Sequence, residues 1–156
     1  MNQHINGKAV TVRTTFRMEN AVSIKINASP EKIWKLLTNV AGYTGWNSTI
    51  VNISGNIVLG GKVNLVSKLD PKRTFKLKVV EFQPAKKLVW KDGFAPMFQG
   101  VRTYELTPAS DGSTFFSMSE VLSGLMLPLI AKSLPDFKPN FEQIALDLKR
   151  AAESNY

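Results

Sequence analysis

The feature that most constrains this fold is one amphipathic helix near the C-terminus, preceded almost entirely by strand-like sequence. Its apolar residues recur at spacings of three and four positions, which is the period of a helix with one apolar face: Phe137, Phe141, Ile144, Ala145 and Leu148. Because proline disrupts a helix interior, the regular part is expected to begin near Pro135 or later. One face of this helix must be buried against the rest of the chain.

The segments before this helix have the alternation and the turn-bounded lengths of strands. In the first, Val22, Ile24 and Ile26 alternate with polar residues. Short turn signals, such as Asp70-Pro71, separate the later ones and join antiparallel neighbours. These later strands are expected near 48–54, 61–69, 73–83, 86–92, 98–108 and 113–122. The sequence therefore predicts a meander of seven strands.

A short helix follows the first strand. Ser29 can cap its free amides and Pro30 suits its first position, so we expect a helix from Pro30 to about Asn39. Residues 1–18 carry little apolar pattern and are expected to form a loose leader or an extra edge strand. Residues 19–156 are expected to form one domain.

This order of elements favours an α+β fold in which a curved antiparallel sheet wraps around the C-terminal helix. The sheet has one apolar face and only one long helix to cover it, so it has to curl around that helix. A curled sheet and a single helix leave a space between them. Apolar spaces of this kind typically hold small molecules.

Cysteine and histidine usage excludes several kinds of chemistry. The 156 residues contain no cysteine and one histidine, His4. Thiolate sites, iron–sulfur clusters and histidine-based triads therefore lack their essential groups, and the carboxylates show no calcium-loop spacing. We expect no metal and no cofactor, and a reducing cytoplasm is the expected compartment.

The formal net charge of +8 is spread over strand-like sequence, mostly between Lys62 and Lys91. We interpret these residues as surface charge on a solvated sheet face and expect no nucleic-acid ligand. The apolar run Leu122–Ile130 is too short to span a bilayer. Burial against a lid explains this run, with transient membrane contact as the alternative. Phe94–Phe98 is apolar where a loop is usually polar, and is the candidate lid.

Two polar residues fall on strands that are expected to line the cavity. The two-residue period places Arg102 on the same face as Tyr104, and Glu120 on the same face as Met118. A short turn joins the two strands, so Arg102 and Glu120 can meet across the sheet. Such a pair could orient a polar ligand group or simply form a satisfied bridge, and both interpretations stay open. The candidate residues for the cavity wall, which could equally form core, are Trp46, Trp90, Phe98, Tyr104, Phe116, Met118 and Phe141.

Short motifs follow one another in a characteristic order over residues 21–153. They are SPEKIW at 29–34, YTGWN at 43–47, LVW at 88–90, GVRTYELTP at 100–108, GST at 112–114 and EVLSG at 120–124. In this order they resemble the SRPBCC (START-related, helix-grip) superfamily, and more closely its polyketide cyclase and dehydrase-like branch.

The resemblance implies a hydrophobic cavity between sheet and helix, used for lipids, polyketides, quinones or aromatic metabolites. It implies no particular reaction, because members include carriers, receptors, cyclases and chaperone ATPase activators. The Rieske oxygenase branch is excluded, since its iron centre needs histidine ligands. We therefore expect binding of a small hydrophobic ligand, with Arg102 and Glu120 as polar anchors. The alternatives are a polyketide cyclase or dehydrase-like enzyme and a module that binds a protein partner; catalytic residues and oligomeric state stay open.

Overall fold

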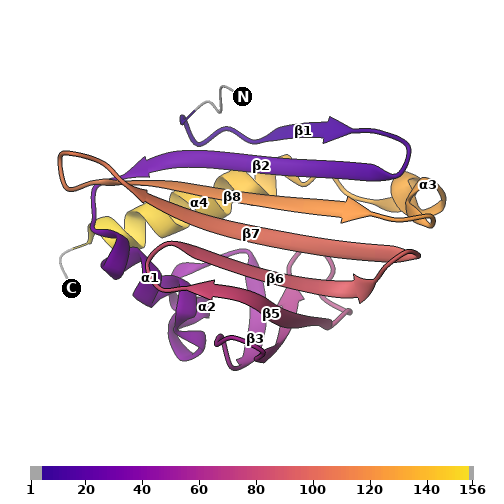
Figure 1. The fold of residues 1–156 in the computed structure, drawn as a ribbon, viewed down its shortest axis with the longest axis horizontal. Coiled ribbons are helices and arrows are strands. Elements are labelled where there is room, and N and C mark those ends of the chain that lie inside the picture. Colours follow the sequence, from indigo (N-terminus) through magenta and orange to yellow (C-terminus); the bar gives the residue numbers. More distant parts are fainter. Residues whose placement is uncertain (1–4, 155–156) are drawn as a thin grey trace.

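A computed structural model describes residues 5–154 as one antiparallel sheet curved around a long helix (Figure 1). The eight strands lie in the order β1-β2-β8-β7-β6-β5-β4-β3. The strands are β1 (Val10–Arg13), β2 (Arg17–Ile26), β3 (Ile50–Gly55), β4 (Lys62–Ser67), β5 (Phe75–Gln83), β6 (Lys87–Phe94), β7 (Phe98–Pro108) and β8 (Thr114–Ser123). The helices are α1 (Pro30–Thr38), α2 (Tyr43–Trp46), α3 (Leu127–Ile130) and α4 (Lys138–Glu153), with 3-10 turns at Val40–Gly42 (η1) and Ala131–Ser133 (η2).

The sheet contains the seven predicted antiparallel strands and one more, but the predicted meander of seven is wrong at its first strand. Strands β3–β8 form a meander, whereas β2 pairs with β8 and not with β3, because α1, η1 and α2 carry the chain from β2 to the opposite edge of the sheet. The seven predicted strands correspond to β2–β8, and β7 has the predicted bounds. The eighth strand, β1, forms from the segment expected to be a loose leader or an extra edge strand, and it pairs antiparallel with β2. The sequence signal was weak because β1 is exposed along its whole length, so it has no buried face to impose an alternation.

Local signals set the start of α1 as the sequence predicts. The Ser29 side chain accepts a hydrogen bond from the Lys32 amide at 3.2 Å, and Pro30 occupies the first turn. The buried side chains of this helix are Ile33 and Leu37, one turn apart. Residues 40–46 form a 3-10 turn followed by α2, which extends the helical layer beside α4.

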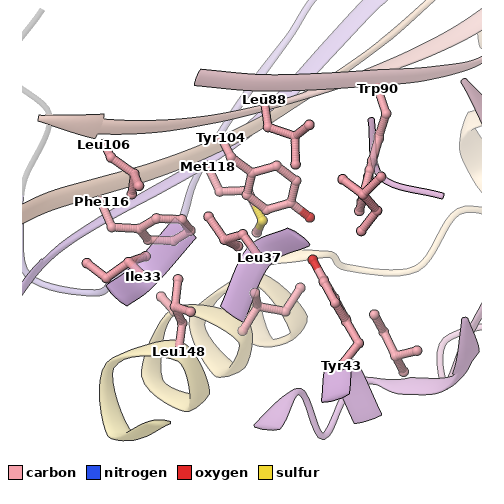
Figure 2. Packing of buried hydrophobic residues seen from close by; sticks show 14 of the residues in the cluster. Ile33, Leu37, Tyr43, Leu88, Trp90, Tyr104, Leu106, Phe116, Met118 and Leu148 are labelled. Atoms are coloured by element: carbon pink, nitrogen blue, oxygen red, sulfur yellow. The ribbon is translucent and has the colours of Figure 1, made fainter. Parts of the chain in front are cut away.

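The long helix α4 lies against the concave face of the sheet, and the interior between them is filled by side chains (Figure 2). Burial of each large apolar side chain stabilises the fold by roughly 1.5–3 kcal/mol, so this contact dominates stability. We call these residues the main cluster: Val22, Ile26, Ile33, Leu37, Tyr43, Ile50, Ile53, Ile57, Val63, Leu65, Val79, Leu88, Trp90, Tyr104, Leu106, Phe116, Met118, Phe141, Ile144, Ala145, Leu148 and Ala152.

A second, smaller cluster lies where the chain passes from β8 to α4. Its buried residues are Met18, Leu122 and Leu127, and partly buried side chains pack on it, among them Phe98 of β7 and Phe137, which also contacts the main cluster. Pro135 and Pro139 flank the start of α4, so the apolar run before it forms the separate single turns α3 and η2. Short elements rather than the long helix therefore cover Met18 and Leu122 at this end of the sheet.

Three lysines lie directly opposite one another on the convex face of the sheet. Lys62 of β4 pairs with Lys78 of β5, which pairs with Lys91 of β6. All three are exposed, and within residues 5–154 none has a carboxylate within 4 Å. Adjacent strands are only about 4.8 Å apart, and like charges in this arrangement repel.

Neutralising the central lysine should therefore stabilise the fold. Lys78→Gln is expected to raise the midpoint of thermal unfolding at low ionic strength by a few degrees, since each like-charge pair costs about 0.2–1 kcal/mol. The gain should disappear in about 1 M salt, where charges are screened within about 3 Å. Lys8→Gln, at an exposed position without a charged partner, is the control, and an equal gain in that variant would contradict the interpretation.

Candidate ligand-binding site

A row of polar residues crosses the concave face of the sheet from strand to strand. Thr11 of β1 lies opposite Asn20 of β2, Asn20 opposite Glu120 of β8, and Glu120 opposite Arg102 of β7. The Thr11 hydroxyl donates a hydrogen bond to Asn20 Oδ1 at 2.5 Å, and Asn20 is only 2% exposed. We call these four residues the polar row.

The polar row separates the main cluster from the second cluster. Along β8 the inward residues are Met118, then Glu120, then Leu122, which belong to the main cluster, the polar row and the second cluster in turn. Strand β2 repeats this order with Asn20 in the middle. The two-residue period of each strand thus brings one polar residue to the same level of an otherwise apolar interior.

Arg102 and Glu120 form the ion pair that their cross-strand positions predict. Arg102 Nη2 lies 2.6 Å from Glu120 Oε2, and the two side chains are 16% and 22% exposed. A pair this shielded from solvent interacts more strongly than a surface pair, but each charge depends on its partner. Removing one member alone would leave the other poorly compensated.

The rest of the guanidinium of Arg102 faces aromatic groups. Nη1 donates a long hydrogen bond of 3.5 Å to the Tyr104 hydroxyl, and the Phe141 ring centre lies 5.2 Å from Cζ. Burial opposes the charge, but the Glu120 carboxylate and the Tyr104 hydroxyl outweigh it, so the pKa of Arg102 lies above its ordinary value. Arg102 Nε is buried without a hydrogen-bond partner in the described structure. One donor of a fixed cation is therefore unused.

Tyr43 supplies a second unused polar group. Its side chain is fully buried and its hydroxyl points toward the Tyr104 hydroxyl (Figure 2), yet it forms no hydrogen bond of good geometry with any described residue. Burial and the neighbouring Tyr104 hydroxyl raise the pKa of Tyr43, and the charge of Arg102 opposes this only in part. An unsatisfied buried polar group costs roughly 1–3 kcal/mol, so two in one place call for an explanation.

Aromatic and apolar side chains surround these polar atoms. The rings of Trp90 and Tyr104 pack edge to face at 5.3 Å, and Phe116 lies 6.3 Å from Tyr104. Met118 and Phe141 are fully buried in the same cluster. Five of the predicted wall residues therefore come together with Arg102, and in this structure they fill the interior as core.

Trp46 and Phe98 lie apart from that group. Trp46 belongs to α2, where its indole Nε1 donates to the Leu36 carbonyl at 3.1 Å and its ring faces a groove between helices. Phe98 packs on the second cluster. Phe94, part of the predicted lid, is 71% exposed. The sequence could not separate these residues because aromatic type and strand period do not specify which helix covers which end of the sheet.

Tyr43, Asn20 and Asp92 belong to this region and were not predicted. Asp92 lies on β6 two residues after Trp90, so the period of the strand was a usable signal. Burial, and then the Glu120 charge, raise the pKa of Asp92, whereas Arg73 and Arg102 oppose the shift. Within residues 5–154, no three acidic, histidine or cysteine side chains gather closely enough to hold a metal ion, and His4 lies outside these residues.

Solved structures share this architecture. A START superfamily protein from Mycobacterium smegmatis has a TM-score of 0.64 at 15% identity, over 86% of this chain and 97% of that one. A hypothetical protein from Helicobacter pylori has a TM-score of 0.70 at 13% identity, over 90% and 89%. A protein of the dynemicin biosynthetic locus has a TM-score of 0.64 at 16% identity, over 86% of this chain but 46% of that one. No curated protein matches the sequence.

The curved sheet closed around α4 defines a START-like, helix-grip protein. The sequence model of the family described as polyketide cyclase / dehydrase and lipid transport matches residues 17–153. The chain belongs to this family. Fold and family together indicate a scaffold for binding hydrophobic ligands. None of the helices within residues 5–154 is long and apolar enough to cross a membrane.

The raised pKa of Asp92 predicts a specific dependence of stability on pH. Because folding favours the protonated carboxyl, Asp92 opposes folding increasingly as the pH rises above its ordinary pKa near 3.8. Asp92→Asn should therefore unfold at a higher temperature than the natural protein at pH 7, and the difference should shrink toward pH 4.

Asp111→Asn serves as a control of opposite sign. Hydrogen bonds from Ser113 and then from Lys25 lower the pKa of Asp111, so its loss should destabilise the protein at pH 7, by an amount that shrinks on acidification. Thermal unfolding followed by circular dichroism at several pH values measures both differences. The same sign for both variants would contradict the assignment.

Proposed function

We propose that the protein binds a small hydrophobic molecule carrying one oxygen-bearing polar group, such as a carbonyl, phenol or carboxylate. The observation that carries this proposal is the pair of unused buried donors, Arg102 Nε and the Tyr43 hydroxyl, on two residues that both neighbour Tyr104. A ligand oxygen is a suitable acceptor for both donors. In this arrangement Glu120 holds the guanidinium in place rather than contacting the ligand body.

The ligand body would lie at the boundary between the two clusters. The candidate contacts are Trp90, Tyr104, Phe116, Met118 and Phe141 on the main-cluster side and Phe98 on the other. Because side chains fill this interior, binding requires the α3–η2 segment, which carries Leu127 of the second cluster, to move away from the sheet. This segment consists of two single turns, and the backbone amides of Leu125 and Met126 just before it donate to the β6–β7 turn, so the segment and that turn would move together.

Binding without turnover is the preferred function, and a cyclase or dehydrase-like activity is the alternative. In the enzyme, Glu120 would accept a proton or Tyr104 would donate one to the bound molecule. The 2.6 Å contact between Glu120 and Arg102 favours an anchor, because the carboxylate already has a fixed partner. The aromatic lining suits a polyketide, a quinone or a lipid chain equally well.

Native mass spectrometry of freshly purified protein, compared with the denatured mass, tests whether a molecule is retained. A panel of fatty acids, quinones and aromatic polyketides should then raise the unfolding temperature in proportion to occupancy. Replacing both charges, in Arg102→Met with Glu120→Met, removes the anchor without leaving an unpaired charge and should weaken binding about tenfold or more. The matched control replaces Arg17 and Glu19, an exposed ion pair, in the same way.

Glu120→Gln separates the two functions. An anchor should lose affinity, whereas a proton acceptor should lose turnover and keep most of its affinity. If no adduct appears and no compound of the panel raises the unfolding temperature, the binding proposal fails, and a protein-partner function of the basic sheet face takes its place.

We further propose transient contact with an anionic membrane at the end of the sheet near α3 (Figure 1). Three turns meet there through backbone hydrogen bonds from Gly124 to Phe16 and from Met126 to Met97. Arg13 and Lys132 are exposed basic residues on the same segments. These turns carry large exposed apolar side chains, with the exposed fraction after each: Phe16 51%, Phe94 71%, Met97 41%, Leu125 57% and Leu129 74%.

A surface of this kind inserts side chains into lipid while its cations attract the headgroups. The variant Phe94→Ser with Leu129→Ser should bind phosphatidylserine-containing vesicles about tenfold more weakly in a sedimentation assay, the loss of roughly 1.4 kcal/mol. Val51→Ser with Val58→Ser, at apolar positions that are about half exposed elsewhere on the surface, should bind as the natural protein does. Absence of vesicle binding by the natural protein, or an equal loss in both variants, would contradict membrane contact.

A further inference from the structure

A groove of about 630 Å³ lies outside the sheet–helix interior, between α1, α2 and the last turns of α4. This volume lies within the range of small-molecule sites. The groove is lined by Lys35 and Leu36 of α1, Gly45 and Trp46 of α2, and Arg150 and Ala151 of α4, among others. It is a separate concavity from the proposed ligand site, because α4 stands between them with Phe141 and Leu148 facing the main cluster.

One side of the groove is apolar and rigid. The Trp46 indole is held by its hydrogen bond to the Leu36 carbonyl, and its ring packs against Tyr43 at 4.9 Å between centres. A Cβ atom added at Gly45 would meet no atom within 4 Å, so the wall is open beside the ring. The flat indole face and the open wall suit a planar or narrow apolar body.

The other side carries positive charge that no carboxylate of the described residues pairs with. Lys32 donates to the Ser154 carbonyl at 2.6 Å, which satisfies it at the end of α4. Neither Lys35 nor Arg150 has a carboxylate within 4 Å among residues 5–154.

Asp147 is the lining carboxylate, and its oxygens are already used. Oδ2 accepts hydrogen bonds from the backbone amide and hydroxyl of Ser48, at 2.8 and 2.6 Å, and Oδ1 accepts one from Gln143 at 2.7 Å. Within the described part of the chain, the groove therefore presents two cations without a carboxylate partner, Lys35 and Arg150, beside a fixed aromatic ring.

We infer that this groove is a second binding site, for a small organic anion with a flat apolar body, such as an aromatic carboxylate. The carboxylate would lie between Lys35 and Arg150, and the apolar body would lie against Trp46 and Leu36. Arg150 can hold a carboxylate through two parallel hydrogen bonds, which gives the site a preference for planar anions. This site does not depend on the proposed function of the interior.

Titration of the ¹⁵N-labelled full chain with 2-naphthoate tests the assignment by nuclear magnetic resonance. The backbone amides of Gly42 and Gly45 and the indole N–H of Trp46 should shift and saturate. The neutral analogue 2-naphthalenemethanol should bind about tenfold more weakly, because it makes no charge-assisted contact. The double variant Lys35→Gln with Arg150→Gln should weaken the binding of 2-naphthoate by a similar factor. Its affinity for the neutral analogue should stay unchanged.

Two further variants distinguish this site from general charge attraction and from the interior. Lys8→Gln with Lys132→Gln removes the same charge elsewhere and should leave the affinity for 2-naphthoate unchanged. Gly45→Leu, at a position whose backbone accepts a side chain, should fill the groove and weaken the binding of both 2-naphthoate and the neutral analogue. The inference is overturned if no saturable shift appears at millimolar 2-naphthoate, or if the shifts centre on Arg102 and Tyr104. It is also overturned if the double variant at Lys8 and Lys132 weakens binding as much as the double variant in the groove.

Discussion

The fold depends on one contact, the burial of the apolar face of α4 in the concave face of a single sheet. No other long helix is available within residues 5–154, so the strands must curve until their inward residues reach α4 from several sides. The short helix α1 contributes Ile33 and Leu37 to the same interior. Each of the outer features, including the edge strand β1 and the turns around α3, is attached to this central contact.

Burying polar atoms inside this apolar contact costs free energy, so the presence of the polar row there calls for an explanation. Apolar residues at these four positions would join the two clusters into one continuous core. The chain instead places an ion pair there, with one unused guanidinium donor and one unused tyrosine hydroxyl close by. Such an arrangement costs stability, and retaining it is reasonable where a ligand supplies the missing partner. This is the physical basis for locating the ligand at the boundary between the clusters.

The fold and half of the candidate site follow from patterns within single elements. Local patterns predicted the elements well, because each depends only on neighbouring residues of one strand or helix. These patterns are the period of the strands, the Ser29-Pro30 helix start and the spacing of Phe141, Ile144 and Leu148. The Arg102–Glu120 pair was predictable too, since a short turn fixes the register of β7 and β8. The sequence could not show which of Trp46 and Tyr43 faces the interior, because both lie on the single turn α2. Only the docking of α2 on α4 gives the two side chains different surroundings.

By itself the sequence determined the order of elements, the alternation that builds one apolar sheet face, and the absence of cysteine and of all but one histidine. These are properties of neighbouring residues and of composition. Only the tertiary structure decided that Tyr43 points at Tyr104, that Trp46 faces an outer groove with Lys35 and Arg150, and that the interior divides into two clusters. The reason is that such contacts join residues far apart in the chain, and no local period records the angle at which helices cross the sheet.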